Sequence, residues 1–362
     1  MGTLLVAAGG GGDAIAAAAL SALAPDDAVG IATMAWDRLI IDPLPGPRSA
    51  ADFRALRARQ GWWQVTPHSR PIAPAGSTLP RLAAEIPLPL VLLDPTRGAY
   101  GMRQQIQNAA TELRADHIRL VDVGGDLLGR PGDTGLRSPF ADALTAASCV
   151  TLPAKAWIAG PGLDGELTED LVWHRAAKRA TVHTLGLEIW KPYLPVLDWH
   201  PTEATALLAS ATQALRGTVE IRDAGLPVHL TDRSPTVLEI DLTAVADINP
   251  LVPVLTRTDS LAEAEHQAVQ AMGATELQAE RAKAAAKTER FQPPAGDALA
   301  SLPEWEIAAR HRNIDFVTYR RIAEALGHTD VPTIKTLLAA RHPHRAVGLL
   351  WAVTDGLDRP HH

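Results

Sequence analysis

Short apolar runs alternate with amphipathic or alanine-rich stretches through the first half of the chain. The runs that predict strands are Thr3–Ala8, Ala28–Thr33, Val91–Asp94, His117–Val123 and Ala156–Ala159. The stretches that predict helices are Asp13–Leu23, Ala50–Gln60, Tyr100–Leu113 and Pro139–Ala147. Because apolar strands that alternate with helices are typical of parallel sheets, the pattern predicts an α/β fold whose mainly parallel sheet carries helices on both faces.

The second half of the chain has a less regular pattern. In chain order it predicts helices over Thr168–Ala177 and Pro201–Leu215, a strand pair at Val219–Ile221 and Val228–Leu230 or a strand around Thr236–Asp241, a charged alanine-rich helix over 259–290, a proline-rich linker over 291–303, and further helices over 304–350. We therefore expect an α/β domain over residues 1–255 and a mostly helical C-terminal region over residues 256–362.

Nucleic-acid binding is disfavoured by the charge of the chain. Residues 319–338 have the pattern of a helix-turn-helix with Gly327 at the turn. Any two short helices joined by a glycine share that pattern, however. The formal net charge is −7 and the isoelectric point is about 6.0, so no overall positive field attracts a polyanion.

The single cysteine and the hydropathy of the chain exclude several classes of protein. Cys149 lies in an apolar run and cannot form a disulfide or a thiolate metal cluster within this sequence, so we predict a small buried side chain. The thirteen histidines are scattered without metal-ligand spacing. The N-terminus lacks a basic segment, and no apolar run reaches about 18 residues, so we expect a cytoplasmic protein that does not enter a membrane.

A run of four glycines separates the first predicted strand from the first predicted helix. Gly9, Gly10, Gly11 and Gly12 lie where the N–H groups of a helix N-terminus suit a phosphate or a carboxylate. Asp13 adds a negative charge at the same place, which favours a larger ligand of mixed charge over a bare phosphate. The sequence contains no G-x-G-x-x-G with the spacing of a dinucleotide site, no P-loop and no G-x-S-x-G.

A second cluster of polar residues follows the second predicted strand. Trp36 offers an apolar wall, Asp37 and Asp42 offer carboxylates, and Arg38 and Arg48 offer paired donors for an anion. An equally good interpretation is a rigid proline-rich loop whose aspartates and arginines pair with one another.

The third cluster, after the strand at 117–123, is the densest. Asp122 and Asp126 flank Gly124 and Gly125, which would let the backbone pass close to a ligand. Asp133 and Asp142 add negative charge, with Arg137 as the nearest counter-ion in sequence. Ser138 precedes Pro139 and is expected to be a helix N-cap rather than a nucleophile.

Two further acidic segments come later in the chain. Asp164 and Glu166 lie in a glycine-rich loop and are free to contact a ligand, whereas Thr168 is expected to cap the next helix. Thr202 is expected to cap a later helix, which leaves Glu203 either as a charge in the first helical turn or as a ligand contact.

These segments resemble the domain-of-unknown-function family 1152 of archaea and bacteria. The matching segments are Gly9–Asp13, Trp36–Arg38, Asp42-Pro, Pro45–Arg48, Asp122–Asp126, Gly135–Pro139, Ala141–Asp142, Asp164–Thr168 and Thr202–Ala204. They occur in the order of the family and cover roughly residues 1–240. The family's Trp-Glu-Arg reads Trp-Asp-Arg here, with Asp37 shorter by one methylene, and residues beyond about 290 match less clearly. The resemblance implies a Rossmann-like fold but no assigned reaction.

Parallel strands bring their carboxyl ends to one edge of the sheet, so the polar clusters are expected to meet there. Two chemistries fit: carboxylates that hold Mg²⁺, or carboxylates that receive ammonium and hydroxyl groups while arginines bind an anion. We expect an enzyme for hydrolysis or transfer on a small nucleotide-like or amino-acid-like molecule, with Asp122, Asp126 and Asp13 as acid/base or metal-binding groups. The Gly9–Gly12 turn and Arg48 or Arg137 are expected to hold the anionic part of that molecule. The alternative is a non-catalytic ligand sensor or scaffold whose helical C-terminus binds a partner.

An open pocket with convergent aspartates favours the enzyme. Aspartates that are each paired with Arg38, Arg48 or Arg137 favour the scaffold. Whether copies of the chain associate into a homo-oligomer is left open.

Overall fold

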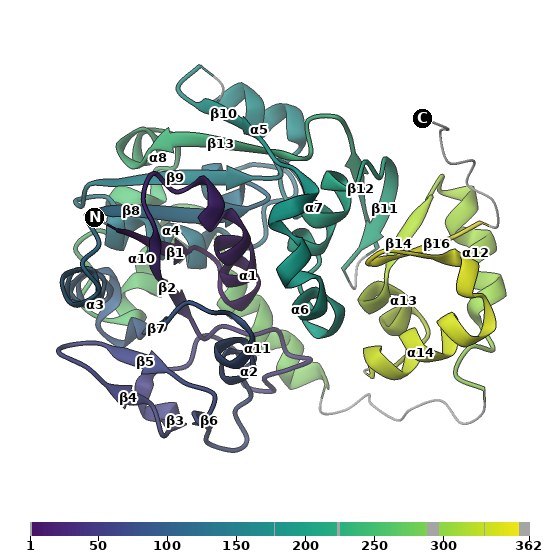
Figure 1. Cartoon of the computed structure of the whole chain (residues 1–362), viewed down its shortest axis with the longest axis horizontal. Helices are drawn as coiled ribbons and strands as arrows, with labels where there is room; N and C mark the ends of the chain where they lie inside the picture. Colours follow the sequence, from purple (N-terminus) through teal and green to yellow (C-terminus); the bar gives the residue numbers. More distant parts are fainter. Residues whose placement is uncertain (1, 177, 223–224, 288–296, 329, 355–362) are drawn as a thin grey trace.

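The computed structural model describes residues 2–176, 178–222, 225–287, 297–328 and 330–354. Over these residues the chain forms a nine-stranded sheet with helices on both faces, beside a five-stranded sheet that carries the C-terminal helices (Figure 1). The α/β fold with a large, mainly parallel sheet is confirmed.

Five parallel strands form the centre of the large sheet. They are β1 (Thr3–Ala7), β2 (Ala28–Met34), β7 (Leu90–Leu93), β8 (His117–Val123) and β9 (Ala154–Ala159), which correspond to the five strands predicted in the first half of the chain. Antiparallel strands extend both edges: β13 (Thr236–Asp241) and β10 (Thr181–Thr184) beyond β9, and β5 (Trp63–Val65) and β4 (Arg57–Ala58) beyond β7.

The order of the parallel strands, β9-β8-β1-β2-β7, reverses direction at β1. The chain runs from β1 through β2 to β7 on one side and then crosses back, so that β8 pairs with the free side of β1. Loops that follow β1 and β8 therefore leave the sheet toward opposite faces, and a crevice opens between them at the carboxyl ends. The four glycines and the loop that starts at Asp122 lie at this place.

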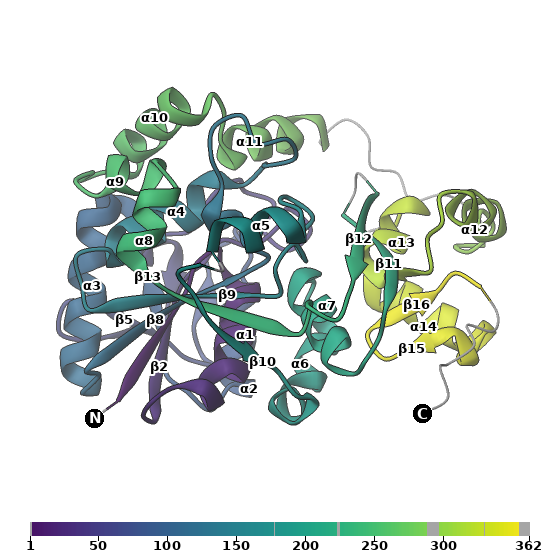
Figure 2. The same ribbon diagram turned by 90° about the horizontal axis from the view of Figure 1, so that it is seen from above.

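Helices cover both faces of the large sheet (Figure 2). One face carries α3 (Gly98–Leu113), α4 (Pro139–Cys149), α5 (Glu169–Ala176), α8 (Leu242–Ile248), α9 (Leu251–Leu255) and α10 (Leu261–Met272). The other face carries α1 (Gly11–Leu20), α2 (Leu79–Glu85), α6 (Leu194–Trp199) and α7 (Ala204–Thr212). Strand β1 is buried on both faces because Leu4 and Val6 point to the first layer and Leu5 to the second.

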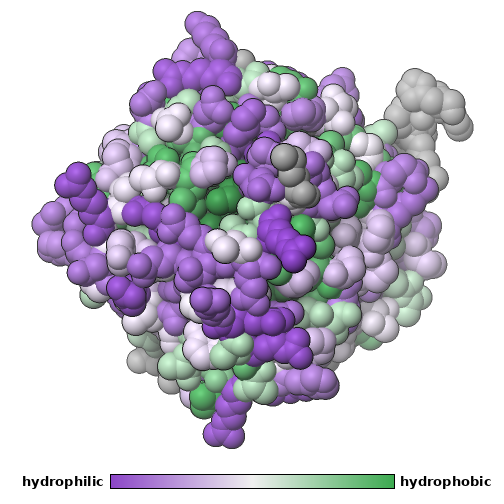
Figure 3. Space-filling view, turned by 60° about the vertical axis from the view of Figure 1, so that its left-hand side comes forward, coloured by the Kyte–Doolittle hydropathy of each residue, from purple (hydrophilic) through white to green (hydrophobic). Residues whose placement is uncertain are grey.

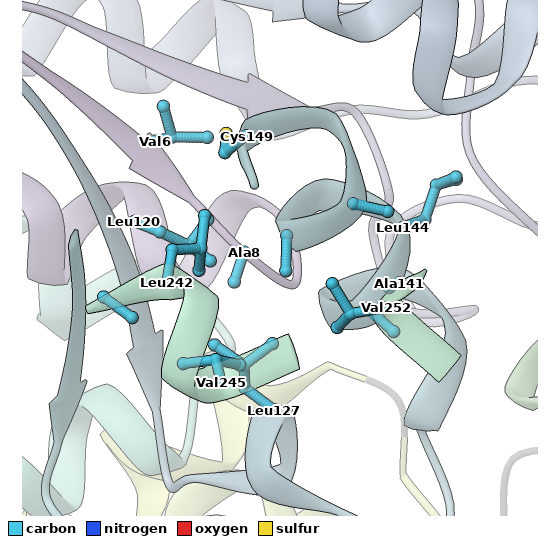
Figure 4. Packing of buried hydrophobic residues seen from close by; sticks show 14 of the residues in the cluster. Val6, Ala8, Leu120, Leu127, Ala141, Leu144, Cys149, Leu242, Val245 and Val252 are labelled. Carbon is cyan, nitrogen blue, oxygen red and sulfur yellow. The ribbon is translucent and has the colours of Figure 1, made fainter. Parts of the chain in front are cut away.

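The first layer forms a continuous apolar core in which Val6 and Leu120 meet Leu144, Cys149 and Leu242 (Figure 4). Cys149 is fully buried, as its apolar surroundings predicted. Burial raises the pKa of its thiol to about 12.

The five-stranded sheet has the order β12-β11-β14-β16-β15. The predicted strand pair is confirmed as the antiparallel strands β11 (Gly217–Ile221) and β12 (Leu226–Leu230). The region expected to be mostly helical contains α12 (Leu302–His311), α13 (Tyr319–Ala325) and α14 (Val331–Arg341), but also β14 (Phe316–Thr318), β15 (Ala346–Val347) and β16 (Leu350–Ala352). Phe316 packs toward the main core and Val317 toward the C-terminal helices, so β14 is buried on both faces like a central strand.

The prediction of a helix over Ala50–Gln60 is wrong. Ser49 and Asp52 form a capping box around a single 3₁₀ turn at Ala50–Asp52, after which the chain extends into β3 (Phe53–Arg54), paired with β6 (Arg70–Pro71), and then β4. Ala55 has a positive φ of 58°, which a helix cannot accommodate.

The single helix predicted over 259–290 is two helices, α10 and α11 (Glu276–Lys287). Gly273 ends α10 in the left-handed conformation with φ 85°, as C-terminal glycines commonly do. The last residues of that predicted helix, 288–290, and residues 291–296 of the predicted linker lie outside the described residues.

None of the described helices combines the length and apolar composition that a bilayer crossing requires. On the face shown in Figure 3, hydrophobic side chains form only small areas among hydrophilic ones.

Substitution Leu120→Ala is expected to lower the free energy of unfolding by about 2–5 kcal/mol, because a fully buried leucine leaves a cavity between β8 and the helices of its layer. Urea unfolding followed by circular dichroism measures this. The matched control is Leu337→Ala, whose side chain is 38% exposed and whose loss is expected to cost under about 1 kcal/mol. Equal effects of the two substitutions would contradict the placement of Leu120 in the core.

The thiol of Cys149 is expected to be unreactive toward an aromatic disulfide reagent in the native protein, because it is buried and its pKa is raised. In denaturant one equivalent should react, and the absorbance of the released thiolate counts it. Fast reaction of the folded protein would show that the first layer is not packed as described.

Candidate functional site

A cavity of about 590 Å³ lies at the carboxyl ends of β1, β2 and β8. Most of the residues predicted for the site line it: Gly9, Gly10, Gly11, Gly12, Asp13, Trp36, Asp37, Arg38, Asp122, Asp126, Asp133, Arg137, Asp164 and Glu203. Five do not line it: Asp42, Arg48, Gly124, Gly125 and Glu166. Segments far apart in sequence, including α11 and the start of α13, complete the wall.

The glycines at the start of α1 are required by the close packing of neighbouring loops. Gly10 has φ 142°, and a Cβ atom there would lie 2.8 Å from the carbonyl oxygen of Trp36. The other three are enclosed in a similar way: a Cβ atom would lie 3.1 Å from Asp13 Oδ2 at Gly9, 2.9 Å from Thr78 Oγ1 at Gly11 and 2.6 Å from Thr202 Oγ1 at Gly12. The turn therefore brings loops together, and its backbone also forms part of the cavity wall.

Three carboxylates converge beside this turn. Asp122 is the penultimate residue of β8, Asp126 begins the 3₁₀ turn after it, and Asp142 lies in the first turn of α4. One oxygen from each lies within 4.8 Å of the others, and all three side chains are buried. Asp142, which the sequence predicted in the same cluster, is adjacent because α4 packs directly on the loop after β8.

The environment of these carboxylates opposes their ionisation. Burial, together with repulsion from Asp13 and Asp164, raises the pKa of Asp122 well above its ordinary value. Burial and the neighbouring carboxylates likewise raise the pKa of Asp126 and of Asp142. In the described residues no arginine or lysine forms an ion pair with any of the three, and neither oxygen of Asp122 has a hydrogen-bond partner. A compensating positive charge is therefore missing at the centre of the cluster.

Asp13 and Asp164 flank the cluster. Burial raises the pKa of each to about 7, although the Gly9 N–H donates to Asp13 Oδ2 at 2.8 Å. Gly124, with φ 121°, leaves room for Asp164, because a Cβ atom there would lie 2.3 Å from the Asp164 carboxyl carbon. That close approach, rather than access to a ligand, accounts for the glycine.

Ser138 does not cap α4 through its side chain, contrary to the prediction. Its Oγ donates to Glu166 and lies 3.2 Å from Asp126 Oδ2. The N-terminus of α4 is instead capped by Glu276 of α11, whose carboxylate accepts hydrogen bonds from the backbone N–H groups of Phe140 and Ala141. A serine next to a proline indicates a cap, but a carboxylate from a distant helix occupies that position.

The loop after β2 combines features of a ligand-binding loop and of a rigid, internally paired loop, the two interpretations of its sequence. Asp42 and Arg48 pair with each other at 3.0 Å, as in a rigid loop. Asp37 accepts from the Thr78 hydroxyl at 2.7 Å, and the Trp36 Nε1 donates to Glu280 of α11 at 2.9 Å. Arg38 extends into the cavity.

Three further expectations concern single polar contacts. Thr168 caps α5 by accepting the Leu171 N–H at 3.3 Å, as predicted. Thr202 does not cap α7, because its hydroxyl donates to Thr205 instead. Arg137 is not the counter-ion of the cluster.

Asp133 forms its ion pair with Arg175, at 2.6 Å, and not with Arg137. Hydrogen bonds from Arg175 hold the pKa of the Asp133 carboxyl below its usual range. Arg137 contacts Glu166 through its backbone N–H at 2.7 Å.

Two arginines that the sequence did not single out stand in the cavity wall. Arg222 donates to Glu166 at 2.8 Å, and Arg320 donates to Glu203 at 3.1 Å. Burial alone would raise the pKa of both glutamates, but the arginines and further hydrogen bonds outweigh it and lower both. Each arginine follows a strand of the small sheet, and recognising that sheet would have drawn attention to them.

The fold and the cavity define an α/β protein with a carboxylate-rich site at the switch point of a mainly parallel sheet. The chain belongs to the family described as a protein of unknown function, DUF1152, whose sequence model matches residues 4–284. Neither the curated proteins nor the solved structures contain a match to this chain.

Substitution Gly10→Ala is expected to destabilise the protein by more than about 1 kcal/mol, because φ 142° is strained for alanine and the new methyl would meet the Trp36 carbonyl. Chemical unfolding measures the loss. The control is Gly186→Ala, where φ is −103° and no atom lies within 4 Å of the added methyl. If Gly10→Ala were as stable as that control, the packing described for the turn would be wrong.

Proposed function

We propose that this protein is a Mg²⁺-dependent enzyme that hydrolyses or transfers a group of a small polar molecule, nucleotide-like or amino-acid-like, at the carboxyl edge of a Rossmann-like sheet. The strand order β9-β8-β1-β2-β7 supports the Rossmann-like assignment, since nucleotide-binding sheets reverse direction at their first strand. The cavity lies at that reversal, where such sheets bind their ligands.

The observation that carries the proposal is the burial of the Asp122 carboxylate without a compensating charge. Both of its oxygens are buried and neither has a partner at hydrogen-bond geometry, although the Gly125 backbone and Asp126 partly offset the rise of its pKa. One of these oxygens lies within 4.8 Å of a carboxylate oxygen of Asp126 and of Asp142. Several buried negative groups at such short range are costly unless a cation or protons compensate them. Carboxylate oxygens from three chain positions match the ligands that Mg²⁺ prefers, with room in the cavity for its waters and for substrate oxygens.

On this basis the acidic residues in and beside the cluster have roles in metal binding, proton transfer or orientation. Asp122, Asp126 and Asp142 would hold the ion, which supplies a Lewis acid for the reacting oxygen. Asp13 stands beside Asp142 and is oriented by the Gly9 N–H, so it is placed to hold or release a proton of the substrate or of water. Glu166 accepts from Ser138 and so fixes the Ser138 hydroxyl, whose oxygen lies 3.2 Å from Asp126 Oδ2.

The scaffold alternative needs the aspartates to be neutralised by arginines. Arg48 is paired with Asp42 outside the cavity, and Arg137 forms no ion pair with the described aspartates. Buried carboxylates that line a cavity and form no ion pair among the described residues support catalysis over a purely structural role.

Isothermal titration with MgCl₂ is expected to show one binding event in the wild type, and a thermal-shift assay should show a rise of several degrees. Asp122→Asn should abolish both. In EDTA the Asn variant should melt at the wild-type temperature or above it, because the substitution removes a destabilising buried charge. The control is Asp232→Asn, whose side chain is 98% exposed and which should bind Mg²⁺ like the wild type.

The same assay extended to nucleotides, amino acids and sugar phosphates, with and without Mg²⁺, identifies the substrate class. Absence of Mg²⁺ binding by the wild type would overturn the metal site. A wild type that no compound stabilises would overturn the substrate pocket.

A further inference from the structure

We propose that Arg38, Arg222 and Arg320 form a phosphate subsite in the wall of the cavity, so that the substrate is a phosphorylated small molecule. This inference rests on the proposed function for the fate of the substrate, but the subsite itself is defined by residues outside the carboxylate cluster.

The three arginines converge from distant parts of the chain. Arg222 follows β11 and Arg320 lies in the first turn of α13, directly after β14. Because β11 and β14 are parallel neighbours, their carboxyl ends deliver both side chains to the same edge of the small sheet. Arg38 follows β2 of the large sheet and lines the same cavity. Arg320 lies outside residues 4–284, so part of the wall comes from beyond the segment that matches the family.

Two of the arginines are held in place by buried glutamates. Glu166 receives Arg222 at 2.8 Å and also accepts the backbone N–H of Ser138. Glu203 receives Arg320 Nη1 at 3.1 Å, and the Thr318 hydroxyl donates to it at 2.6 Å. Arg320 is held further by Glu324, which accepts from its Nε and Nη2 at 3.1 Å. These glutamates are positioning residues, since they fix the guanidinium groups before any ligand arrives.

Donor capacity remains after these pairs are made. A guanidinium has five N–H donors, and among the described residues Arg222 uses one in a side-chain bond while the Arg38 side chain makes no hydrogen bond or ion pair. Arg38 keeps an exposed surface toward the cavity. Arg38 and Arg222 therefore offer several charged donors that no described protein group uses, whereas Arg320 contributes mainly its positive charge.

The charges around Arg38 are consistent with a site that binds an anion. Desolvation inside the cavity, with repulsion from Arg320 and Arg222, lowers the pKa of Arg38 to about 10, although part of its side chain stays exposed, and Arg38 remains charged at neutral pH. His200 beside it stays neutral, because burial and the charge of Arg38 lower its pKa to about 3. The carboxylates that face this wall, Glu166 and Glu203, are each already bound to one arginine.

The geometry favours phosphate over carboxylate. A carboxylate is satisfied by one guanidinium fork, whereas a tetrahedral phosphate offers oxygens to several at once. The N–H groups of Gly11 and Gly12, which have no acceptor among the described residues, lie in the same cavity at the start of α1 and would support the same anion. A phosphate held here would also reach toward a Mg²⁺ ion at the carboxylate cluster.

Inorganic phosphate is the probe, titrated by calorimetry at constant ionic strength into the full-length protein in EDTA and, separately, in Mg²⁺. The wild type should bind phosphate in both arms and should not bind acetate comparably. Arg38→Gln should weaken phosphate binding at least tenfold in EDTA, and Arg38→Lys should lose less. Arg179→Gln, at a half-exposed arginine away from the cavity, is the matched control and should bind like the wild type.

Folding does not confound this comparison, because Arg38 has no ion pair to lose within the part of the chain that the structure describes, and each variant's melting temperature is compared with that of the wild type. No phosphate binding by the wild type, unchanged binding by Arg38→Gln, or equal binding of acetate would overturn the subsite. Binding that occurs only with Mg²⁺ and is indifferent to Arg38 would support the metal site alone. Arg38-dependent binding by a protein that does not bind Mg²⁺ would support the subsite and overturn the proposed metal.

Discussion

The burial of negative charge at the carboxyl edge of the large sheet constrains much of this structure. Asp122, Asp126 and Asp142 lie within reach of one oxygen-binding ion, with Asp13 and Asp164 beside them. None of the three central groups has a basic partner among the described residues, and the pKa of each is raised. Such an arrangement costs folding free energy, and proteins commonly retain that cost where function requires it.

The surrounding elements neutralise and orient the outer acidic groups while leaving the centre open. Ion pairs join Arg175 to Asp133, Arg222 to Glu166, and Arg320 to Glu203. Helix α11 closes the edge of the cavity by two contacts, Glu276 at the start of α4 and Glu280 at Trp36. The distribution leaves an acidic centre and an arginine-lined wall within one cavity, which suits a ligand that carries both a metal-bound group and an anion.

The role of the glycine turn is narrower than its sequence suggests. Protein atoms already occupy the space that side chains would need at Gly10, Gly11 and Gly12, so close packing of the loops accounts for glycine at these positions. The backbone at the start of α1 also lines the cavity. Loop packing and ligand access therefore impose the same residue type at one turn.

The sequence by itself determined the alternation of strands and helices in the first half, the burial of Cys149 and the meeting of the main acidic loops, because apolar periodicity and the rule for carboxyl ends are local signals. It could not determine partners that come from distant segments. Ser138 has the local pattern of a cap, yet Glu276 caps that helix from far along the chain. The pairing of Asp42 with Arg48 was one of two interpretations that the sequence left open, whereas Arg222 and Arg320 reach the cavity only because β11 and β14 pair across about 100 residues of chain. Only the tertiary structure decides which charged side chains neutralise one another, since that depends on distances between elements that local sequence patterns do not encode.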